Sequence, residues 1–362
     1  MRLAVTLEQC WHRVPGGTAT SVLRSVDALG RRADVELVGV AARHGHPPAE
    51  PYGLPVPVWE LGLPRPLLYA SWHRLRRPAV ERATGPVDAV WASGVAVPPR
   101  RVPLVVTVHD LAPLHHPEHH PRRAQGFYRQ AFALARTEAD LVCCPSQATL
   151  EDCAAHGFDR GRLRHVPWGV TPLPVTRHAI TEMRTRLGLD EEYVLWTGTI
   201  EPRKNLPGLI EAFARIARPG LLLAVAGPDG WHEDLRALIG EREDIRALGF
   251  VSDADLAALY AGAAVFCYPS LLEGFGLPVL EAMAQGAPVV TSAGTATEEL
   301  VAGVGGAVDP TDVGAVAGAL SAVLDDPAEA DRRRAAGRVR AAELTWDATA
   351  AAMMDVVHEA IA

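Results

Sequence analysis

The sequence contains almost no lysine. Of its 35 basic residues, 34 are arginine, and the only lysine is Lys204. A GC-rich genome, which favours codons for Arg, Ala, Gly and Pro, explains most of this bias but not why one lysine remains. A lysine kept against the bias points to a position that needs a compact ammonium group rather than a planar guanidinium.

Long apolar runs are also absent. The longest candidate, residues 256–268, has 13 residues and is rich in alanine, whereas a membrane-spanning helix needs about 20. The apolar start, residues 1–7, is too short for a signal peptide. The five cysteines are odd in number and lack metal-ligand spacing, which argues against a disulfide framework. We therefore expect a cytoplasmic protein.

The charge is modest and unevenly spread. The net charge is −8; residues 1–175 carry 20 Arg against 15 acids (+5), which leaves −13 for the rest. This first half is too weakly basic for nucleic-acid binding, but it suits an anionic substrate or an anionic membrane surface. The length of 362 residues, with 48% hydrophobic and 22% charged residues, indicates a globular protein of two domains.

The first half alternates between strand and helix patterns. An apolar run at 3–7 is followed by a helical pattern that opens at Gly16 and Gly17 and closes at Gly30, and then by a second apolar run at 35–40. This is a βαβ unit, which requires a parallel sheet. Later segments of the same kind are strands at 89–91, 104–108 and 141–144 and a helix at about 123–137.

After a proline-rich stretch at 167–180, which we interpret as a linker, the alternation restarts. The expected strands are 193–196, 221–226, 265–268 and 288–291, and the expected helices are 206–217, 231–239, 278–285 and segments beyond 312. We predict an α/β fold with two Rossmann-like doubly wound domains, residues 1–172 and 173–343, and a final helix in 344–362. Ligands of such domains bind beyond the carboxyl ends of the strands, in the cleft between them.

One motif places two cations after a strand. The strand at 193–196 ends near Gly198, and Arg203 and Lys204 follow, with Asn205 able to cap the next helix. Cations beside a helix N-terminus form a site for phosphate oxygens. The alternative is a solvated Arg-Lys pair on a surface turn, which the single lysine makes less attractive.

A second motif frames two glycines with two acids. Glu273 is followed by the loop Gly274, Phe275, Gly276 and Leu277, and Glu281 lies about one turn into the next helix. Glycines let backbone N–H groups approach a ligand closely, and a carboxylate can accept hydrogen bonds from a sugar diol. The alternative for Glu281 is a favourable interaction with the helix dipole.

His109 and Asp110 follow a first-domain strand. The histidine can hydrogen-bond a leaving phosphate or a sugar hydroxyl, with Asp110 available to orient it; a buried structural histidine is the alternative. The Gly16-Gly17 pair is a weak phosphate signal, because it lacks the full G-x-G-x-x-G of a dinucleotide site.

Two patterns imitate metal sites, and we expect no metal at either. A histidine-rich tract interrupted by prolines lacks a helical pair with a third ligand; its members are His115, His116, His119 and His120. Asp253 and Asp255 are best explained as acids in a first helical turn, with Ser252 or Asp253 as the N-cap.

The motif with Arg203 and Lys204 and the motif with Glu273 and Glu281 together resemble those that bind the donor in the retaining nucleotide-sugar glycosyltransferases of family 4. These enzymes have the two-Rossmann GT-B architecture. The resemblance rests on 197–205 and on the two-glutamate signature 273–281, and it extends over nearly the whole chain. It includes Ser146 and also Trp346, which opens the helix that in this family crosses back onto the first domain.

The resemblance implies a role for each site residue. Arg203 and Lys204 would hold the donor diphosphate, helped by the backbone of 275–277 and by Gly17. Glu273 would bind the donor sugar and Glu281 the ribose. His109 would lie at the sugar and leaving phosphate, and backbone near Phe250 and Val251 would meet the base.

The same resemblance implies retention of anomeric configuration by front-face displacement, with no cofactor and no metal, because Arg203 and Lys204 supply the neutralising charge. One departure is Trp168, which stands where the family often has asparagine. Packing is the preferred interpretation of Trp168, with stacking on a ligand as the alternative.

The motif containing Lys204 looks most like those of mannosyl- and rhamnosyl-type members, which makes GDP-mannose the first expectation for the donor. The acceptor, a glycan or a lipid-linked or small molecule, would bind the first domain. There the apolar-then-basic stretch 67–77 could touch a membrane, or it is an ordinary surface helix. Three alternatives stay open: a sugar-nucleotide epimerase, a phosphorylase and a non-catalytic nucleotide-sugar binder.

Overall fold

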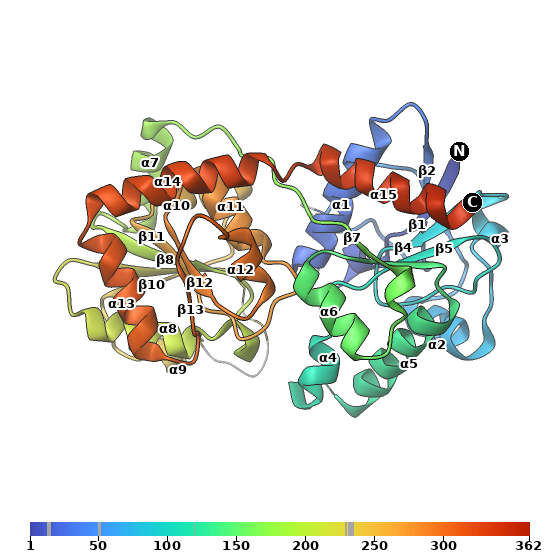
Figure 1. Cartoon of the computed structure of the whole chain (residues 1–362), viewed down its shortest axis with the longest axis horizontal. Coiled ribbons are helices and arrows are strands. Elements are labelled where there is room, and N and C mark those ends of the chain that lie inside the picture. The colour runs from blue at the N-terminus through green and yellow to red at the C-terminus, as the bar shows by residue number, and fades with distance from the viewer. Residues whose placement is uncertain (13–15, 50–51, 120, 229, 231–234) are drawn as a thin grey trace. The chain divides into compact units, whose positions relative to one another are not determined.

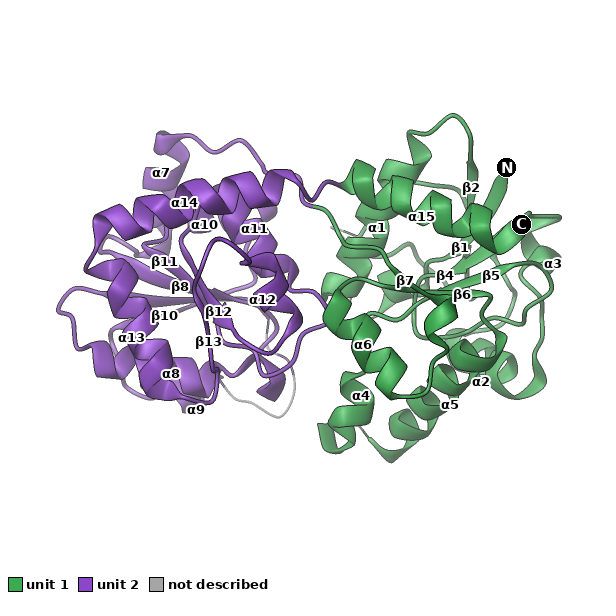
Figure 2. Ribbon diagram, viewed as in Figure 1, with its two compact units in different colours: residues 1–169, 346–362 green, residues 170–345 purple. Residues whose placement is uncertain are grey.

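A computed structural model describes residues 1–12, 16–49, 52–119, 121–228, 230 and 235–362 (Figure 1). The chain forms two compact units (Figure 2). Unit 1 comprises Met1–Gly169 and Trp346–Ala362, and unit 2 comprises Val170–Thr345. The sequence placed the corresponding boundaries at 172 and 343, close to these positions.

Unit 1 is built on a seven-stranded sheet in which every strand pair is parallel, with the order β3-β2-β1-β4-β5-β6-β7. The strands are β1 (Arg2–Thr6), β2 (Glu36–Ala41), β3 (Val58–Glu60), β4 (Ala89–Ala92), β5 (Leu104–Thr107), β6 (Leu141–Cys144) and β7 (Leu163–His165). The order reverses between β1 and β4, and this switch point is where open α/β sheets bind ligands.

Helices connect these strands: α1 (Gly16–Gly30), α2 (Arg65–Leu75), α3 (Glu81–Thr84), α4 (Ala112–His115), α5 (Arg122–Glu138) and α6 (Gln147–Ala155). In α1 the buried residues include Val22, Val26 and Leu29, whose spacing of four and three places them on one face. The helix ends at Gly30 as expected. Helix α5 also lies where the sequence predicted it.

The last helix, α15 (Trp346–Ile361), belongs to unit 1 and packs on α1, β4, β5 and β6. Met353 and Val357 are fully buried there. Asp347 also pairs with Arg31 of α1 at 2.7 Å. The expectation that the C-terminal helix returns to the first domain is confirmed.

Unit 2 has six parallel strands in the order β10-β9-β8-β11-β12-β13. They are β8 (Tyr193–Thr197), β9 (Leu222–Ala226), β10 (Ile245–Gly249), β11 (Val265–Tyr268), β12 (Val289–Ser292) and β13 (Ala307–Val308). The switch point lies between β8 and β11, the two strands that the candidate donor motifs follow. The two doubly wound units confirm the predicted fold class.

The helices of unit 2 are α7 (Arg177–Leu187), α8 (Leu206–Ile216), α9 (Leu235–Ile239), α10 (Asp253–Gly262), α11 (Leu277–Gln285), α12 (Ala296–Leu300), α13 (Val313–Leu324) and α14 (Pro327–Ala342). Ser252 caps α10 by accepting from the Asp255 N–H, so the cap interpretation of this acidic pair is confirmed. The predicted linker was too long, because Thr176 caps α7 and the helix begins inside it.

Short elements escaped the sequence analysis. Strands β3, β7 and β13 have only two or three residues, too few for an alternation to be recognised. Of the helix expected over 231–239, the part from Leu235 is confirmed as α9, and 231–234 lie outside the described residues. Among the described helices, none is both long enough and apolar enough to cross a bilayer.

Candidate active site

The two motifs expected to bind the donor are joined through their backbones at the switch point of unit 2. The Leu271 N–H donates to the Arg203 carbonyl at 2.8 Å, and the Ser270 hydroxyl oxygen lies 3.0 Å from the same carbonyl oxygen. Segments about 70 residues apart in the chain therefore form one structure after β8 and β11. The sequence predicted each loop but could not show that they touch.

Arg203 is held on several sides. Its Nη2 donates to Glu201 Oε1 at 2.7 Å, and its Nη1 lies 2.9 Å from the Leu272 carbonyl and 3.2 Å from Glu273 Oε2. The side chains are 19% exposed for Arg203 and 7% or less for the two acids. The guanidinium is therefore fixed in place before any ligand arrives.

Lys204 is more deeply enclosed, with 9% of the residue exposed. Its Nζ donates to the Tyr268 hydroxyl at 2.5 Å and to Glu273 Oε1. Ser270 donates to the same carboxylate oxygen at 2.6 Å. Two cations and two carboxylates thus form a nearly balanced cluster in a space that excludes most water.

Burial and charge act in opposite directions in this cluster. Burial by itself would raise the pKa of Glu273, but Lys204 and Arg203 lower it to about 2. Burial and the neighbouring Arg203 lower the pKa of Lys204, while Glu273 opposes that shift. Glu273 is therefore ionised at neutral pH, and the charges of Lys204 and Glu273 depend on each other.

Asn205 does not cap α8 as predicted. It adopts a left-handed backbone with φ of 53°, makes no side-chain cap bond, and its amide donates instead to the Pro310 carbonyl at 2.8 Å. The left-handed conformation turns the chain out of the short 3₁₀ turn Pro202–Lys204. Pro207 is the second residue of the helix, as expected.

The glycine loop leads into α11 through Gly276. This residue has φ of +97°, and a Cβ added to it would lie 2.5 Å from the Thr297 side chain, so both conformation and space favour glycine. Phe275 and Leu277 are buried beside it. The loop therefore leads to the N-terminus of α11, an end of a helix that suits an anion. Pro278 has no N–H, and the Val279 N–H donates to the Gly276 carbonyl at 2.9 Å.

Glu281 is the fifth residue of α11, and a buried tyrosine orients its carboxylate. The Tyr260 hydroxyl lies 3.3 Å from Glu281 Oε2 and 2.9 Å from the Thr197 hydroxyl. Two further residues were expected to contact the donor. Gly198 follows β8, and Gly274 lies in the buried loop. Phe250, expected near the base, is 67% exposed, and Val251 is half-buried.

In unit 1, His109 follows β5, and its ring is anchored by backbone. Its Nε2 lies 2.7 Å from the Ser93 carbonyl; since a carbonyl can only accept, Nε2 carries the proton and Nδ1 is left as an acceptor. Burial lowers the pKa of His109, so the ring is neutral at pH 7. Nδ1 is thus suited to accept a hydrogen bond from a hydroxyl.

Trp168 packs against this histidine. The two ring centroids are 5.7 Å apart, and Trp168 is 3% exposed. The packing interpretation fits this burial better than stacking on a ligand.

The expectation that Asp110 orients His109 is wrong. Asp110 Oδ1 accepts from the Ala112 N–H at 3.0 Å, which stabilises the turn into α4, and the Ser93 carbonyl takes the orienting role. Gly16 and Gly17 are the first residues of α1, where Gly16 has φ of +57° and Gly17 is exposed.

The histidine-rich tract divides into two groups. His115 meets Asp152 of α6 and His156 just after that helix: its Nε2 lies 2.8 Å from Asp152, and Asp152 is 3.1 Å from His156 Nδ1. His116 and His119 gather around Glu118; His120 lies outside the described residues. Sequence reasoning considered only histidine pairs and did not predict that His115 reaches an aspartate–histidine pair; hydrogen bonds account for these contacts.

Sequence reasoning missed Tyr268, Tyr260 and Ser93. Each contacts an expected site residue from a position that the pattern assigns to the core or to a loop. Tyr268 ends β11 and Ser93 follows β4, and these places near the switch points were the only signal for them, whereas Tyr260 lies within α10. A separate hollow of about 630 Å³ beside α7 and α10 is lined by none of the expected site residues.

Known families match both units. The model of "Glycosyltransferase Family 4" matches residues 15–172, and that of "Glycosyl transferases group 1" matches residues 180–340. Together they span most of the chain.

Individual proteins agree with the family models. The O-antigen chain mannosyltransferase B of Escherichia coli is 32% identical over 262 residues, which is 69% of each protein. The D-inositol 3-phosphate glycosyltransferase of Xylanimonas cellulosilytica is 31% identical over 385 aligned positions, covering 95% of this chain and 92% of the relative. The solved structure of Anabaena HepE with UDP and glucose superposes with a TM-score of 0.79 at 21% identity, covering 99% of this chain and 100% of that one, which supports the fold.

Proposed function

The chain belongs to the family 4 glycosyltransferases, and from this premise we propose that it transfers mannose from GDP-mannose to a glycan or lipid-linked acceptor with retention of anomeric configuration and without a metal ion. Its membership and its fold make it a glycosyltransferase with the GT-B architecture. The donor, the acceptor and the residue roles are the content of the proposal.

The observation that carries the proposal is the buried cluster of Arg203, Lys204 and Glu273. The donor diphosphate carries two negative charges, and two fixed cations in a site poor in water stabilise the additional charge that develops as the diphosphate leaves. The positive end of the α11 dipole adds to the same field. In many enzymes a divalent cation provides this stabilisation, so the fixed cations make one unnecessary.

The chemistry is a substitution at the sugar carbon C1. The bond from C1 to the diphosphate oxygen breaks, the acceptor oxygen bonds to C1 from the same face, and the acceptor proton passes to the leaving phosphate oxygen. Lys204 and Arg203 hold that phosphate, Glu273 accepts from sugar hydroxyls, and Glu281 accepts from the ribose. This route needs no protein nucleophile.

His109 contributes from unit 1. A neutral ring with a proton on Nε2 presents Nδ1 as an acceptor for a hydroxyl of the donor sugar, and the Ser93 carbonyl prevents the ring from reversing that role. Its part is therefore to orient the sugar rather than to protonate the leaving group.

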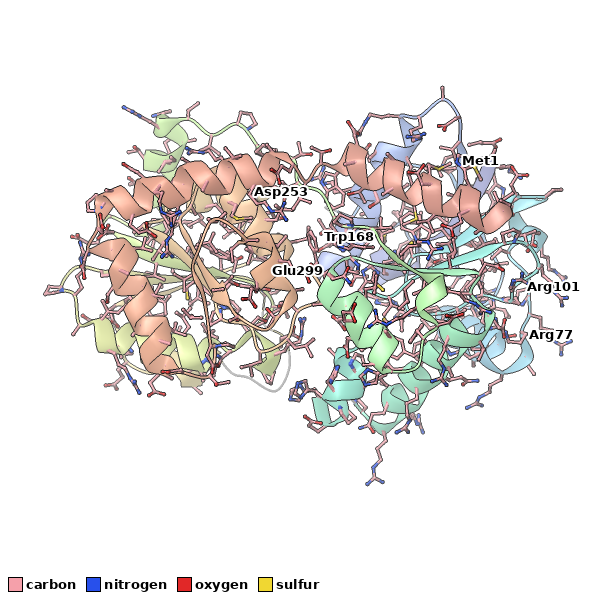
Figure 3. All side chains as sticks on the ribbon, in the orientation of Figure 1. Met1, Arg77, Arg101, Trp168, Asp253 and Glu299 are labelled. Atoms are coloured by element: carbon pink, nitrogen blue, oxygen red, sulfur yellow. The ribbon has the colours of Figure 1, made fainter. Side chains whose placement is uncertain are left out.

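Mannose as the transferred sugar is supported by the name of the E. coli relative, a mannosyltransferase. The Xylanimonas relative is named for inositol phosphate, and HepE was solved with UDP and glucose. A lipid-linked acceptor is supported by helix α2, where Leu67 and Leu75 are each 59% exposed. Arg77, just beyond this helix, and Arg101 are exposed on unit 1 (Figure 3). Apolar and cationic side chains together favour an anionic lipid surface.

The test is a transfer assay with GDP-mannose, UDP-glucose and UDP-N-acetylglucosamine, each supplied with a panel of mannosides and polyprenyl-linked sugars in EDTA. We expect product from GDP-mannose alone, with the α configuration of the donor kept in the proton NMR spectrum. An inverted product contradicts retention, and loss of activity in EDTA that Mg²⁺ or Mn²⁺ restores contradicts metal independence. An epimerised donor would favour the epimerase. Release of product by inorganic phosphate would favour the phosphorylase, and binding without turnover would favour the non-catalytic binder.

A further inference from the structure

Two tyrosine hydroxyls reach the donor-site residues from inside the core of unit 2. Tyr268, the last residue of β11, is fully buried, and Tyr260 of α10 is 2% exposed. Both rings pack against Phe266: the Tyr268 ring stacks with its centroid 5.8 Å away, and the Tyr260 ring meets it edge-on at 5.3 Å. The core therefore fixes where both hydroxyl groups lie.

Tyr268 constrains Lys204. The hydroxyl accepts from Nζ at 2.5 Å, and Nζ lies 5.0 Å from the centroid of the same ring. Burial raises the pKa of Tyr268 well above its ordinary value, so it stays a neutral phenol. An ammonium group has three N–H donors. In the described contacts, Tyr268 and Glu273 accept from two of them. These two contacts fix the direction of the third N–H.

Tyr260 constrains Glu281. Its hydroxyl contacts Glu281 Oε2 at 3.3 Å, and since a carboxylate can only accept, the tyrosine is the donor. The Thr197 hydroxyl at 2.9 Å can donate to the same tyrosine oxygen. This chain of hydroxyl groups starts on β8 and ends on α11, and it fixes the position of one carboxylate oxygen of Glu281.

We propose that Tyr268 and Tyr260 are positioning residues of the donor site, which act through Lys204 on the diphosphate and through Glu281 on the ribose. This inference rests on the proposed function, because it presupposes a nucleoside diphosphate donor. It also accounts for the position of the only lysine, because the space between Tyr268 and Glu273 fits an ammonium group.

The test compares three phenylalanine variants that each remove one buried hydroxyl. Tyr268→Phe and Tyr260→Phe are the variants of interest. Tyr193→Phe is the matched control, since Tyr193 is fully buried in β8 and its hydroxyl donates only to the Leu259 carbonyl at 2.8 Å among the described contacts. Each variant is titrated by calorimetry with GDP and with 2′,3′-dideoxy-GDP, and the same pair is repeated with uridine nucleotides.

The expected pattern separates the two tyrosines. Tyr260→Phe weakens GDP binding about tenfold, the scale of one hydrogen bond to a charged group, and leaves binding of the dideoxynucleotide unchanged. Tyr268→Phe weakens both nucleotides about tenfold. Tyr193→Phe lowers the melting temperature but leaves both affinities at the wild-type level.

A pH series gives a second readout for Tyr268. Nζ is faced by Arg203, Glu201, Glu273 and the Tyr268 hydroxyl, and burial already lowers the pKa of Lys204. Removing an acceptor that favours the charged form lowers this pKa further. The alkaline loss of GDP affinity should therefore begin at lower pH in Tyr268→Phe than in the wild type, and should not move in Tyr260→Phe or Tyr193→Phe.

The outcomes are distinguishable. If the wild-type chain binds neither GDP nor UDP, the proposed donor fails and the inference falls with it. If the wild type binds and both variants behave like Tyr193→Phe, the proposed function stands and the positioning roles are overturned. Should Tyr260→Phe not fold, Thr197→Val interrupts the same chain of hydroxyl groups and must weaken GDP but not the dideoxynucleotide; equal effects on both would contradict the role of Tyr260.

Discussion

At the scale of single residues, position 204 shows why a lysine persists in a chain of arginines. Its ammonium group contacts Tyr268 and Glu273, with 9% of the residue exposed. A guanidinium is larger, planar and fixed in its donor geometry, so it cannot make the same two contacts in that space. The sequence identified the residue, but its enclosure came only from the structure.

Lys204→Arg should therefore lose activity although the charge is kept. We expect kcat/KM for donor to fall at least tenfold, and Lys204→Ala to cost about 3 kcal/mol of transition-state stabilisation. Arg215→Lys is the control, because Arg215 forms an exposed pair with Glu211, and its kinetics should not change. Full activity in Lys204→Arg would mean that the retained lysine is an accident of codon use.

His109 makes a prediction about pH. Burial lowers its pKa below the ordinary value of 6.5, and the proposed role requires the neutral ring. Since the neutral form persists as pH falls until the lowered pKa is reached, the acid limb of kcat/KM should lie below pH 6.5. Trp168→Ala admits water to the ring, so the limb should move upward toward 6.5. An unshifted acid limb at or above 6.5 in the wild type would argue against a buried, neutral His109.

At the scale of elements, the strength of each pattern decided what the sequence could predict. A glycine precedes helix α11, a proline is its second residue, and the helix has an apolar face. These signals predicted the helix, which begins one residue before the predicted start. Strand β13 has two residues and is defined by its partner β12 rather than by its own composition. The loop around Glu273 was predicted from its glycines and its charged residues. The contact of Arg203 with Glu273 depends on the order of the strands in the sheet, so the sequence could not predict it.

The turn into α11 can be tested at Gly276. Gly276→Ala places a Cβ where φ is +97° and a Thr297 methyl lies 2.5 Å away. The free energy of unfolding should fall by about 1–3 kcal/mol, and GDP affinity should fall with it, because the N–H groups of α11 are displaced. Gly318→Ala in α13 is the matched control, since a Cβ there meets no atom within 4 Å, and it should be neutral or slightly stabilising. The measurement is denaturant unfolding of both variants. Equal free energies of unfolding would contradict the strain expected in Gly276→Ala.

At the scale of the whole molecule, the chain leaves unit 1 after Gly169 and returns to it at Trp346. The sequence predicted this return through its resemblance to a family, because composition alone cannot say which unit a terminal helix joins. The structure adds the physical cause: α15 buries Met353, Met354 and Val357 against α1 and the sheet. Unit 1 is therefore incomplete without residues 346–362.

Met353→Ala tests this dependence. Met353 is fully buried and its sulfur lies 4.0 Å from the Cys143 sulfur in β6, so the substitution should cost about 2–5 kcal/mol. Asp355→Ala, on the exposed face of the same helix, should cost less than about 0.5 kcal/mol. The measurement is urea unfolding, and a small effect of Met353→Ala would show that α15 contributes little to unit 1.

We propose that Arg203 and Lys204 bind the diphosphate of a nucleotide sugar, with GDP-mannose as the donor. The decisive measurement is calorimetric titration of the wild type and of Lys204→Ala with GDP-, UDP-, dTDP- and ADP-sugars. We predict that the wild type in EDTA binds GDP-mannose most tightly and that Lys204→Ala weakens this binding at least tenfold. Tightest binding of another nucleotide sugar would contradict the donor assignment, and unchanged affinity in Lys204→Ala would contradict the diphosphate site.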